Sequence, residues 1–149
     1  MQKILFITPP YHCGVVEVAG RWIPLHLLYL AGSARAAGFE CEIYDAMSLD
    51  ASHADIARHI ESSRPDVVAT SCITSTYPDG LEIMKAAKAL GATTVMGGVH
   101  ASFMWREALE EEGGPIDFVV QGEGEETLVE LLTALRNGGD VGAVRGLAH

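Results

Sequence analysis

Two adjacent glycines followed closely by a histidine are the first residues in this sequence that could do chemistry. Gly97, Gly98 and His100 come directly after the apolar run 93–96, a pattern typical of a buried strand that ends in a loop. Glycine has no Cβ atom, so a flat or bulky ligand could lie directly against the backbone there. A tight turn that leads into the next helix is the alternative interpretation.

Two other expected strands also end in unusual segments. The run 3–8 stops at two prolines, which cannot continue a strand, and a long connection carrying Tyr11 and His12 follows. A third run leads into the segment 71–77, which holds five hydroxyl side chains. Conspicuous loops at strand ends often bind ligands. Ser71 could instead cap the helix that is expected to start near Pro78.

The elements that must position these residues alternate along the chain. Apolar runs predict five strands, at 3–8, 39–44, 66–70, 93–96 and 116–120, and helical spacing of apolar residues predicts a helix after each one. Right-handed crossovers then give a doubly wound, five-stranded parallel sheet with three α/β/α layers and the flavodoxin-like order 2-1-3-4-5. Ligands bind such sheets beyond the carboxyl ends of the strands, where the order reverses, here between the first and third strands. The three unusual segments therefore converge.

Composition excludes several classes of protein. The 149 residues include 10 Lys and Arg against 20 Asp and Glu, and the net charge of −10 opposes binding to nucleic acid or to an anionic membrane. No apolar run approaches the roughly 18 residues of a membrane span, and no signal sequence is apparent, so we expect a cytoplasmic protein. Its three cysteines are widely spaced, which argues against a disulfide framework, a zinc site or an iron–sulfur cluster within these residues.

Two common nucleotide-binding motifs are also missing, which reduces the number of ligand classes that the sequence supports. The glycine-rich dinucleotide fingerprint and the phosphate-binding loop of nucleotide hydrolases are both missing from the sequence. A flavodoxin-like FMN carrier would suit the fold and the acidic charge, but its phosphate loop is expected after the first strand, where Pro9 and Pro10 stand. That carrier remains one alternative, and an interaction domain without any ligand is another.

Several short motifs follow one another along the chain. They are Pro10-Tyr11-His12, Leu28-Tyr29-Leu30-Ala31-Gly32, Asp45-Ala46-Met47, Ser71-Cys72-Ile73, Gly97-Gly98-Val99-His100-Ala101 and Gly122-Glu123-Gly124-Glu125. Their order resembles the cobalamin-binding domain of cobalamin-dependent radical SAM enzymes. The resemblance covers nearly the whole chain, and within that family the chain is most similar to the anaerobic magnesium-protoporphyrin IX monomethyl ester cyclases of tetrapyrrole biosynthesis. A radical SAM methyltransferase is the alternative within the same family.

The resemblance implies that this chain is one domain of a longer enzyme, in which separate domains bind the cobalamin and perform the radical reaction. Residues 1–137 would form the cobalamin-binding domain, and residues 138–149 would begin a linker toward a radical SAM domain that these 149 residues do not contain. That domain would bring a [4Fe-4S] cluster and S-adenosylmethionine. The 149 residues alone are therefore expected to bind the cofactor without catalysing the reaction.

The resemblance also implies which residues contact the corrinoid. They are Pro10, Tyr11, His12, Ser71, Ile73, Thr74, Ser75, Gly97, Gly98, His100, Ala101, Gly122 and Gly124. The corrin would lie over the strand ends, and its nucleotide tail would run down beside the sheet past Gly97 and Gly98. On this basis Gly98→Val is expected to abolish corrinoid binding and to leave the fold largely intact.

His12 is the residue that could ligate cobalt from below. The best-known cobalamin-binding domains carry D-x-H-x-x-G in this loop, whereas this chain has Pro10 in place of the Asp and Val15 in place of the Gly. Without a carboxylate to orient the imidazole, His12 could equally be a wall of the site or a surface residue. No metal ligand is therefore assured. Cys72 is expected to be a small buried apolar residue.

Overall fold

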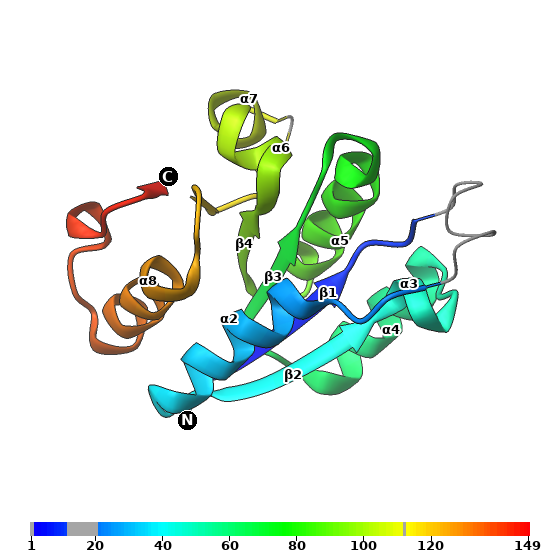
Figure 1. Cartoon of the computed structure of the whole chain (residues 1–149), viewed down its shortest axis with the longest axis horizontal. Coiled ribbons are helices and arrows are strands. Elements are labelled where there is room, and N and C mark those ends of the chain that lie inside the picture. The colour runs from blue at the N-terminus through cyan, green and yellow to red at the C-terminus, as the bar shows by residue number, and fades with distance from the viewer. Residues whose placement is uncertain (1, 12–20, 112) are drawn as a thin grey trace.

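The computed structural model describes residues 2–11, 21–111 and 113–149 (Figure 1). Its strands are β1 (Lys3–Thr8), β2 (Glu40–Asp45), β3 (Val67–Ser71), β4 (Thr93–Gly97), β5 (Phe118–Val120) and β6 (Leu147–Ala148). Its helices are α2 (Leu25–Ala36), α3 (Ala46–Leu49), α4 (His53–Ser63), α5 (Tyr77–Ala89), α6 (Gly98–Phe103), α7 (Trp105–Leu109) and α8 (Glu125–Asn137), with short 3-10 turns η1 (Thr74–Thr76) and η2 (Val141–Ala143).

The strands form one sheet in the order β2-β1-β3-β4-β5-β6. The first five are parallel, which confirms the predicted doubly wound order. A sixth strand, which the sequence analysis did not count, pairs antiparallel with β5 through Val119 and Ala148 and through Val120 and Leu147. Part of the segment predicted as a linker therefore packs on the sheet, and the domain boundary near residue 137 stays a prediction.

Helices cover both faces of the sheet (Figure 1). Side chains alternate along each strand, so Ile4 and Phe6 of β1 pack toward α2 and α8, whereas Leu5 and Ile7 pack toward α4 and α5. All four of these side chains are fully buried. The strands are therefore apolar on both faces, as expected of the centre of a parallel sheet.

The segment Ser52-His53-Ala54-Asp55 has the sequence pattern of a capping box, with Asp in place of the usual Glu, and predicts the start of a helix there. Helix α4 begins in this way. The Ser52 hydroxyl accepts a hydrogen bond from the Asp55 amide at 3.2 Å, and the Asp55 carboxylate accepts one from the Ser52 amide at 2.9 Å. In α4, Ile56 and Ile60 are buried on the face that packs against the sheet. Among the described residues, no helix has the length and apolar character needed to cross a membrane.

Candidate functional site

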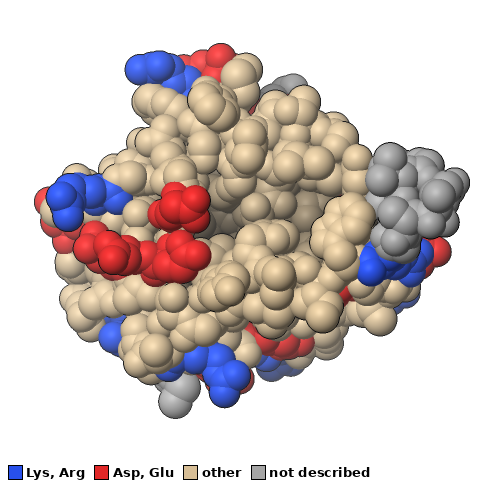
Figure 2. All heavy atoms as spheres, in the orientation of Figure 1, with Lys and Arg blue, Asp and Glu red and all other residues tan. Residues whose placement is uncertain are grey.

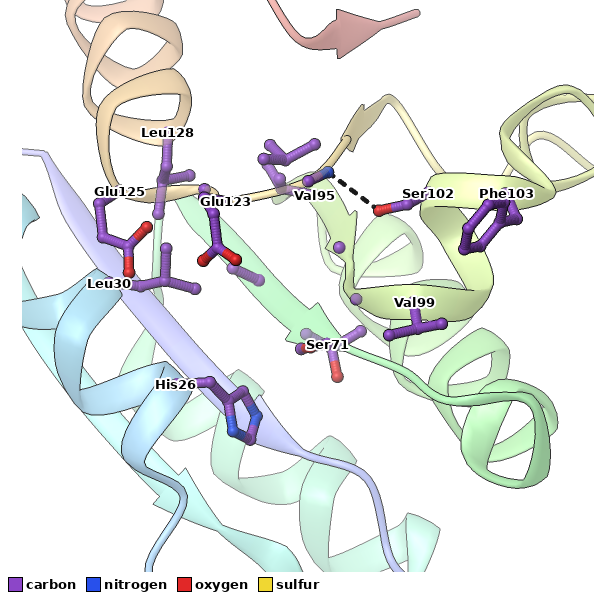
Figure 3. A pocket seen from close by; sticks show the side chains of 17 residues that line it. His26, Leu30, Ser71, Val95, Val99, Ser102, Phe103, Glu123, Glu125 and Leu128 are labelled. Carbon is purple, nitrogen blue, oxygen red and sulfur yellow. Dashed lines mark hydrogen bonds between the residues drawn. The ribbon is translucent and has the colours of Figure 1, made fainter.

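A cavity of about 450 Å³ lies between α2, α8 and the carboxyl ends of β3, β4 and β5 (Figure 3). It opens as a hollow on the face of the molecule shown in Figure 2. The topology had predicted a crevice between the first and third strands, whereas the cavity lies over the third, fourth and fifth. On this face of the sheet, Ile4 and Phe6 of β1 are buried against α2, so β1 contributes no residue to the cavity lining.

Alternate residues of two neighbouring strands form the cavity floor. Ala69 and Ser71 of β3 and Val95 and Gly97 of β4 all lie on the same face of the sheet and line the cavity. Their side chains are small or absent near the strand ends, so the space widens toward the carboxyl edge of the sheet.

Gly97 keeps part of this space empty. Its backbone is extended, with φ −132°, and a Cβ atom placed there would meet only the carbonyl oxygen of Val120, at 3.6 Å. Any residue could adopt this backbone conformation, so the glycine is not needed for the fold of the chain at this point. Its effect is to leave room for a ligand beside the main chain.

Gly98 has a different role from its neighbour. Its φ is +93°, and a Cβ atom would lie 2.5 Å and 2.6 Å from the carbonyl oxygen and the amide nitrogen of Cys72. Helix α6 begins at Gly98, and the amide of His100 donates a hydrogen bond to the same Cys72 carbonyl at 3.1 Å. The tight turn into a helix is therefore the correct backbone interpretation. The expectation that Gly98→Val would leave the fold largely intact is wrong, because the side chain would collide with backbone.

The walls of the cavity come from three helices and one turn. Helix α2 contributes His26 and Leu30, and α8 contributes Leu128. The turn before α8 is fixed by a hydrogen bond from the Gly122 amide to the Ser102 hydroxyl of α6, at 3.1 Å (Figure 3). A Cβ at Gly124 would approach the Leu30 side chain to 3.1 Å, so this glycine lets the start of α8 sit close to α2.

The interior of the cavity is apolar and its polar groups lie toward the mouth. Glu123 and Glu125 stand at the start of α8, where carboxylates also complement the helix dipole. Partial burial lowers the pKa of the His26 imidazole below its ordinary value. Such a cavity suits a ligand with one flat apolar part and a polar remainder.

Five of the predicted contact residues line this cavity. They are Ser71, Gly97, Gly98, Gly122 and Gly124. Pro10 is buried and Tyr11 is partly buried at the end of β1, and neither lines the cavity. His12, the candidate cobalt ligand, lies outside the described residues, and within those residues no three histidine, cysteine or acidic side chains gather as a metal site.

The other predicted contacts lie in and beside α6 and η1 and do not line the cavity. The Nδ1 atom of His100 is 3.2 Å from the Thr74 hydroxyl, and the His100 ring packs on Tyr77 with ring centroids 4.1 Å apart. Ile73 and Ser75 are exposed nearby. Ala101 is fully buried in the core, so its side chain is not accessible to a ligand.

The structure also decides between two interpretations of the segment 71–77. The residue that precedes α5 is Thr76, so Ser71 does not cap this helix. Cys72 is fully buried, and burial raises the pKa of its thiol to about 12, which confirms the expected apolar role.

Several lining residues were not identified from the sequence. Leu30 and Leu128 have the helical spacing of core residues, and the sequence gives no sign that they border a space. His26 and Phe103 lie in segments interpreted only as helix. The one available signal was His26 itself, a polar residue between leucines in the first turn of α2.

Comparison with known proteins connects this geometry to a cofactor. A family model described as the B12 binding domain matches residues 11–132. The anaerobic magnesium-protoporphyrin IX monomethyl ester cyclase of Cereibacter sphaeroides is 42% identical over 136 residues, which cover 89% of this chain and 22% of that protein. An uncharacterized methyltransferase of Pyrococcus horikoshii is 36% identical over all of this chain and 33% of that protein.

A solved structure shares the fold. The cobalamin-dependent S-adenosylmethionine radical enzyme OxsB, with aqua-cobalamin and S-adenosylmethionine bound, superimposes with a TM-score of 0.84 at 18% identity, over all of this chain and 21% of that one. The chain spans between about a fifth and a third of the length of the curated relatives that it matches.

Proposed function

This chain belongs to the B12 binding domain family, and on that premise we propose that it binds cobalamin as the cofactor domain of a radical SAM enzyme of the magnesium-protoporphyrin IX monomethyl ester cyclase type. The corrin ring would lie over the carboxyl ends of the parallel strands. The nucleotide tail would enter the cavity between α2 and α8. The observation that carries the proposal is this cavity, which the missing side chain of Gly97 leaves open beside the sheet.

The residues present fit such a cofactor. Leu30, Val95 and Leu128 offer an apolar slot for a flat base. The hydroxyl of Ser71 is part of the cavity lining, where it could donate a hydrogen bond to the polar part of the tail. These residues bind and orient, and they exclude water from the base. Cobalamin, when bound, supplies a cobalt centre that can carry a methyl group or exchange electrons.

The remainder of the enzyme is part of the same proposal. A radical SAM domain, with its [4Fe-4S] cluster and S-adenosylmethionine, would accompany this chain in a longer polypeptide and would perform the reaction on the substrate. A cytoplasmic location and the lack of nucleic-acid binding also stay predictions.

A radical SAM methyltransferase is the second candidate. It is favoured by the Pyrococcus horikoshii relative, which matches the whole chain and is named as a methyltransferase. Both candidates require cobalamin in this domain, so cofactor binding is the first test, and the reaction must be assigned with the full-length enzyme.

Titration with hydroxocobalamin tests the cofactor proposal. The purified chain should retain the corrinoid on gel filtration, with a visible spectrum that differs from that of the free cofactor. Gly97→Val places a side chain in the cavity without straining the backbone, so it should weaken binding at least about tenfold, since the branched side chain occupies space that the tail needs. Dissociation constants from the absorbance titration measure the effect.

Gly32→Val is the matched control. Gly32 is exposed on α2, has no atom within 4 Å of its Cβ position and does not line the cavity. Equal affinities of the Gly97→Val and wild-type proteins would contradict the tail path. A wild-type protein that binds no corrinoid but is yellow with bound FMN would instead support the flavodoxin-like alternative.

A further inference from the structure

His26 occupies a position in the cavity that the cofactor proposal does not yet use. It is the second residue of α2, whose orientation is set by Leu27, Ala31 and Ala34 buried against the sheet. From that first turn its imidazole projects at the cavity mouth (Figure 3). Among the described residues it has no hydrogen-bond or ion-pair partner, so its ring nitrogens are free to meet a ligand.

The chemistry of His26 differs from that of every other residue around the cavity. Among the described lining residues it has the only side-chain nitrogen and the only side chain that can carry a positive charge. The Thr70 hydroxyl already donates to the carbonyl of Ile7, at 2.9 Å. The Ser102 hydroxyl already accepts from Gly122. A hydroxyl that accepts a hydrogen bond keeps its own hydrogen, so His26, Ser71 and Ser102 remain as the lining side chains that can donate to a ligand without losing a partner.

The distribution of charge around the cavity mouth favours binding of an anionic group on the side where His26 stands. Glu123 and Glu125 stand on the α8 side of the cavity, and acidic groups gather beside the hollow in Figure 2. An anionic group of a ligand would be repelled from that side. The α2 side, where His26 stands, is the side on which such a group can be bound.

We propose that His26 binds the phosphate of the cobalamin nucleotide tail by donating a hydrogen bond from a ring nitrogen, and that it thereby favours a complete cobalamin over a corrinoid without the tail. This inference rests on the proposed function. With the base in the apolar slot, the phosphate that joins it to the corrin ring lies toward the mouth of the cavity. The imidazole carries at least one N–H that it can donate, in its neutral as in its protonated form.

Affinity for two corrinoids tests this role. Hydroxocobalamin carries the nucleotide and its phosphate, whereas cobinamide carries neither. His26→Leu should weaken hydroxocobalamin binding about tenfold, the effect expected from losing one hydrogen bond to a charged group, and should change cobinamide binding less than about twofold. His26→Gln keeps an N–H donor and should retain most of the affinity for hydroxocobalamin. Equilibrium dialysis of the 149-residue chain gives both constants.

Leu25→Ala is the control for damage to α2. Leu25 is exposed in the same turn and does not line the cavity, so neither affinity should change. An equal loss for both corrinoids in His26→Leu, or no loss for either, would overturn the role of His26 and leave the proposed function standing. A wild-type chain that binds neither corrinoid would overturn the proposed function, and the role of His26 with it.

Discussion

Gly80 and Cys72 fit together as a pair at the centre of one helix layer. Gly80 is buried in α5, and a Cβ atom there would lie 2.3 Å from the Sγ atom of Cys72. The sulfur therefore occupies the place of a side chain at Gly80. Because Cys72 is itself fully buried, its sulfur has little room to move aside.

The contact between Gly80 and Cys72 predicts that Gly80→Ala changes the free energy of unfolding in opposite directions with and without the Cys72 sulfur. In the wild-type protein, Gly80→Ala should lower the free energy of unfolding by about 1–3 kcal/mol, because the new methyl group overpacks the core. In a Cys72→Ala background the same substitution should be neutral or stabilising by up to about 1 kcal/mol, because the methyl group fills the vacated space and alanine favours a helix. Urea denaturation of the four proteins measures this double-mutant cycle. Equal effects in the two backgrounds would show that the two positions do not interact.

Residue-level prediction succeeded where a single side chain or its absence carried the signal. Two adjacent glycines at a strand end pointed to Gly97 and Gly98, and both line the cavity. The separate roles of the two glycines could not be predicted, because φ at Gly98 and the empty space at Gly97 depend on contacts with β3 and β5. His26 was missed because its role depends on how α2 lies across the sheet.

At the scale of elements, the junction of β2 with α4 is held by one carboxylate. Glu42 of β2 is 2.9 Å from the Lys3 ammonium, 2.6 Å from Nε2 of His59 and 2.7 Å from the Ser63 hydroxyl. The His59 ring also stacks on Tyr44, with centroids 4.0 Å apart. Partial burial alone would raise the pKa of Glu42, but the hydrogen bonds from Lys3, Ser63 and His59 and the charge of Lys3 lower it to about 2.

A pH dependence follows from this lowered pKa. The pKa of Glu42 in the folded state lies below its ordinary value of 4.5, so its stabilising effect is fully present above about pH 4.5 and is lost as the pH falls toward 2. Glu42→Gln should therefore lower the melting temperature at pH 7. It should also flatten the decline of stability between pH 4.5 and pH 2. Thermal unfolding followed by circular dichroism across this range measures both effects.

Glu40→Gln provides the comparison on the same strand. Glu40 is exposed, so its substitution should leave the melting temperature nearly unchanged at pH 7. If Glu42→Gln and Glu40→Gln give the same curve, the carboxylate network does not stabilise the junction of β2 with α4.

Elements with a strong periodic signal were predicted well, and short ones were not. The capping box at Ser52 and Asp55 placed the start of α4 correctly because it is a local interaction between residues three apart. Helix α6 begins at Gly98, within a segment that could equally be a loop, and two short helices, α6 and α7, stand where one helix was expected after β4. Strand β6 has two residues, too few for any periodicity.

At the scale of the whole molecule, the C-terminal segment closes one edge of the sheet. The Gln121 amide donates to the carbonyl of Gly146 at 2.9 Å, and the Thr127 hydroxyl donates to the carbonyl of Arg145 at 3.1 Å. Ala148 is buried beside β5. Without this segment β5 would present unpaired backbone groups to other chains.

Truncation after Asn137 tests the domain boundary. A chain of residues 1–137 should melt several degrees lower than the full 149 residues, because it loses the pairing of β6 with β5. It should also self-associate more, because the edge of β5 is exposed. Calorimetry and size-exclusion chromatography measure the two effects. Unchanged melting and elution would support the prediction that residues 138–149 serve only as a linker.

The order of the sheet could be predicted because each strand and helix carries its own pattern and handedness rules limit how they connect. The cavity could not be placed, because no local pattern reports the width of the space between α2 and α8. Those helices are separated by most of the chain, and their distance depends on the packing of Leu30 against Gly124 and Val120.

The two helices that form the walls of the cavity, α2 and α8, are synthesised at different times. Helix α2 ends at Ala36, whereas α8 ends at Asn137, so only one of these two walls is present while the roughly one hundred residues between them are being synthesised. A cofactor cannot be enclosed until the second wall has left the exit tunnel and docked. Enclosure of the cofactor therefore has to follow synthesis of nearly all of these 149 residues, and any corrinoid bound then stabilises the fold that has just been completed.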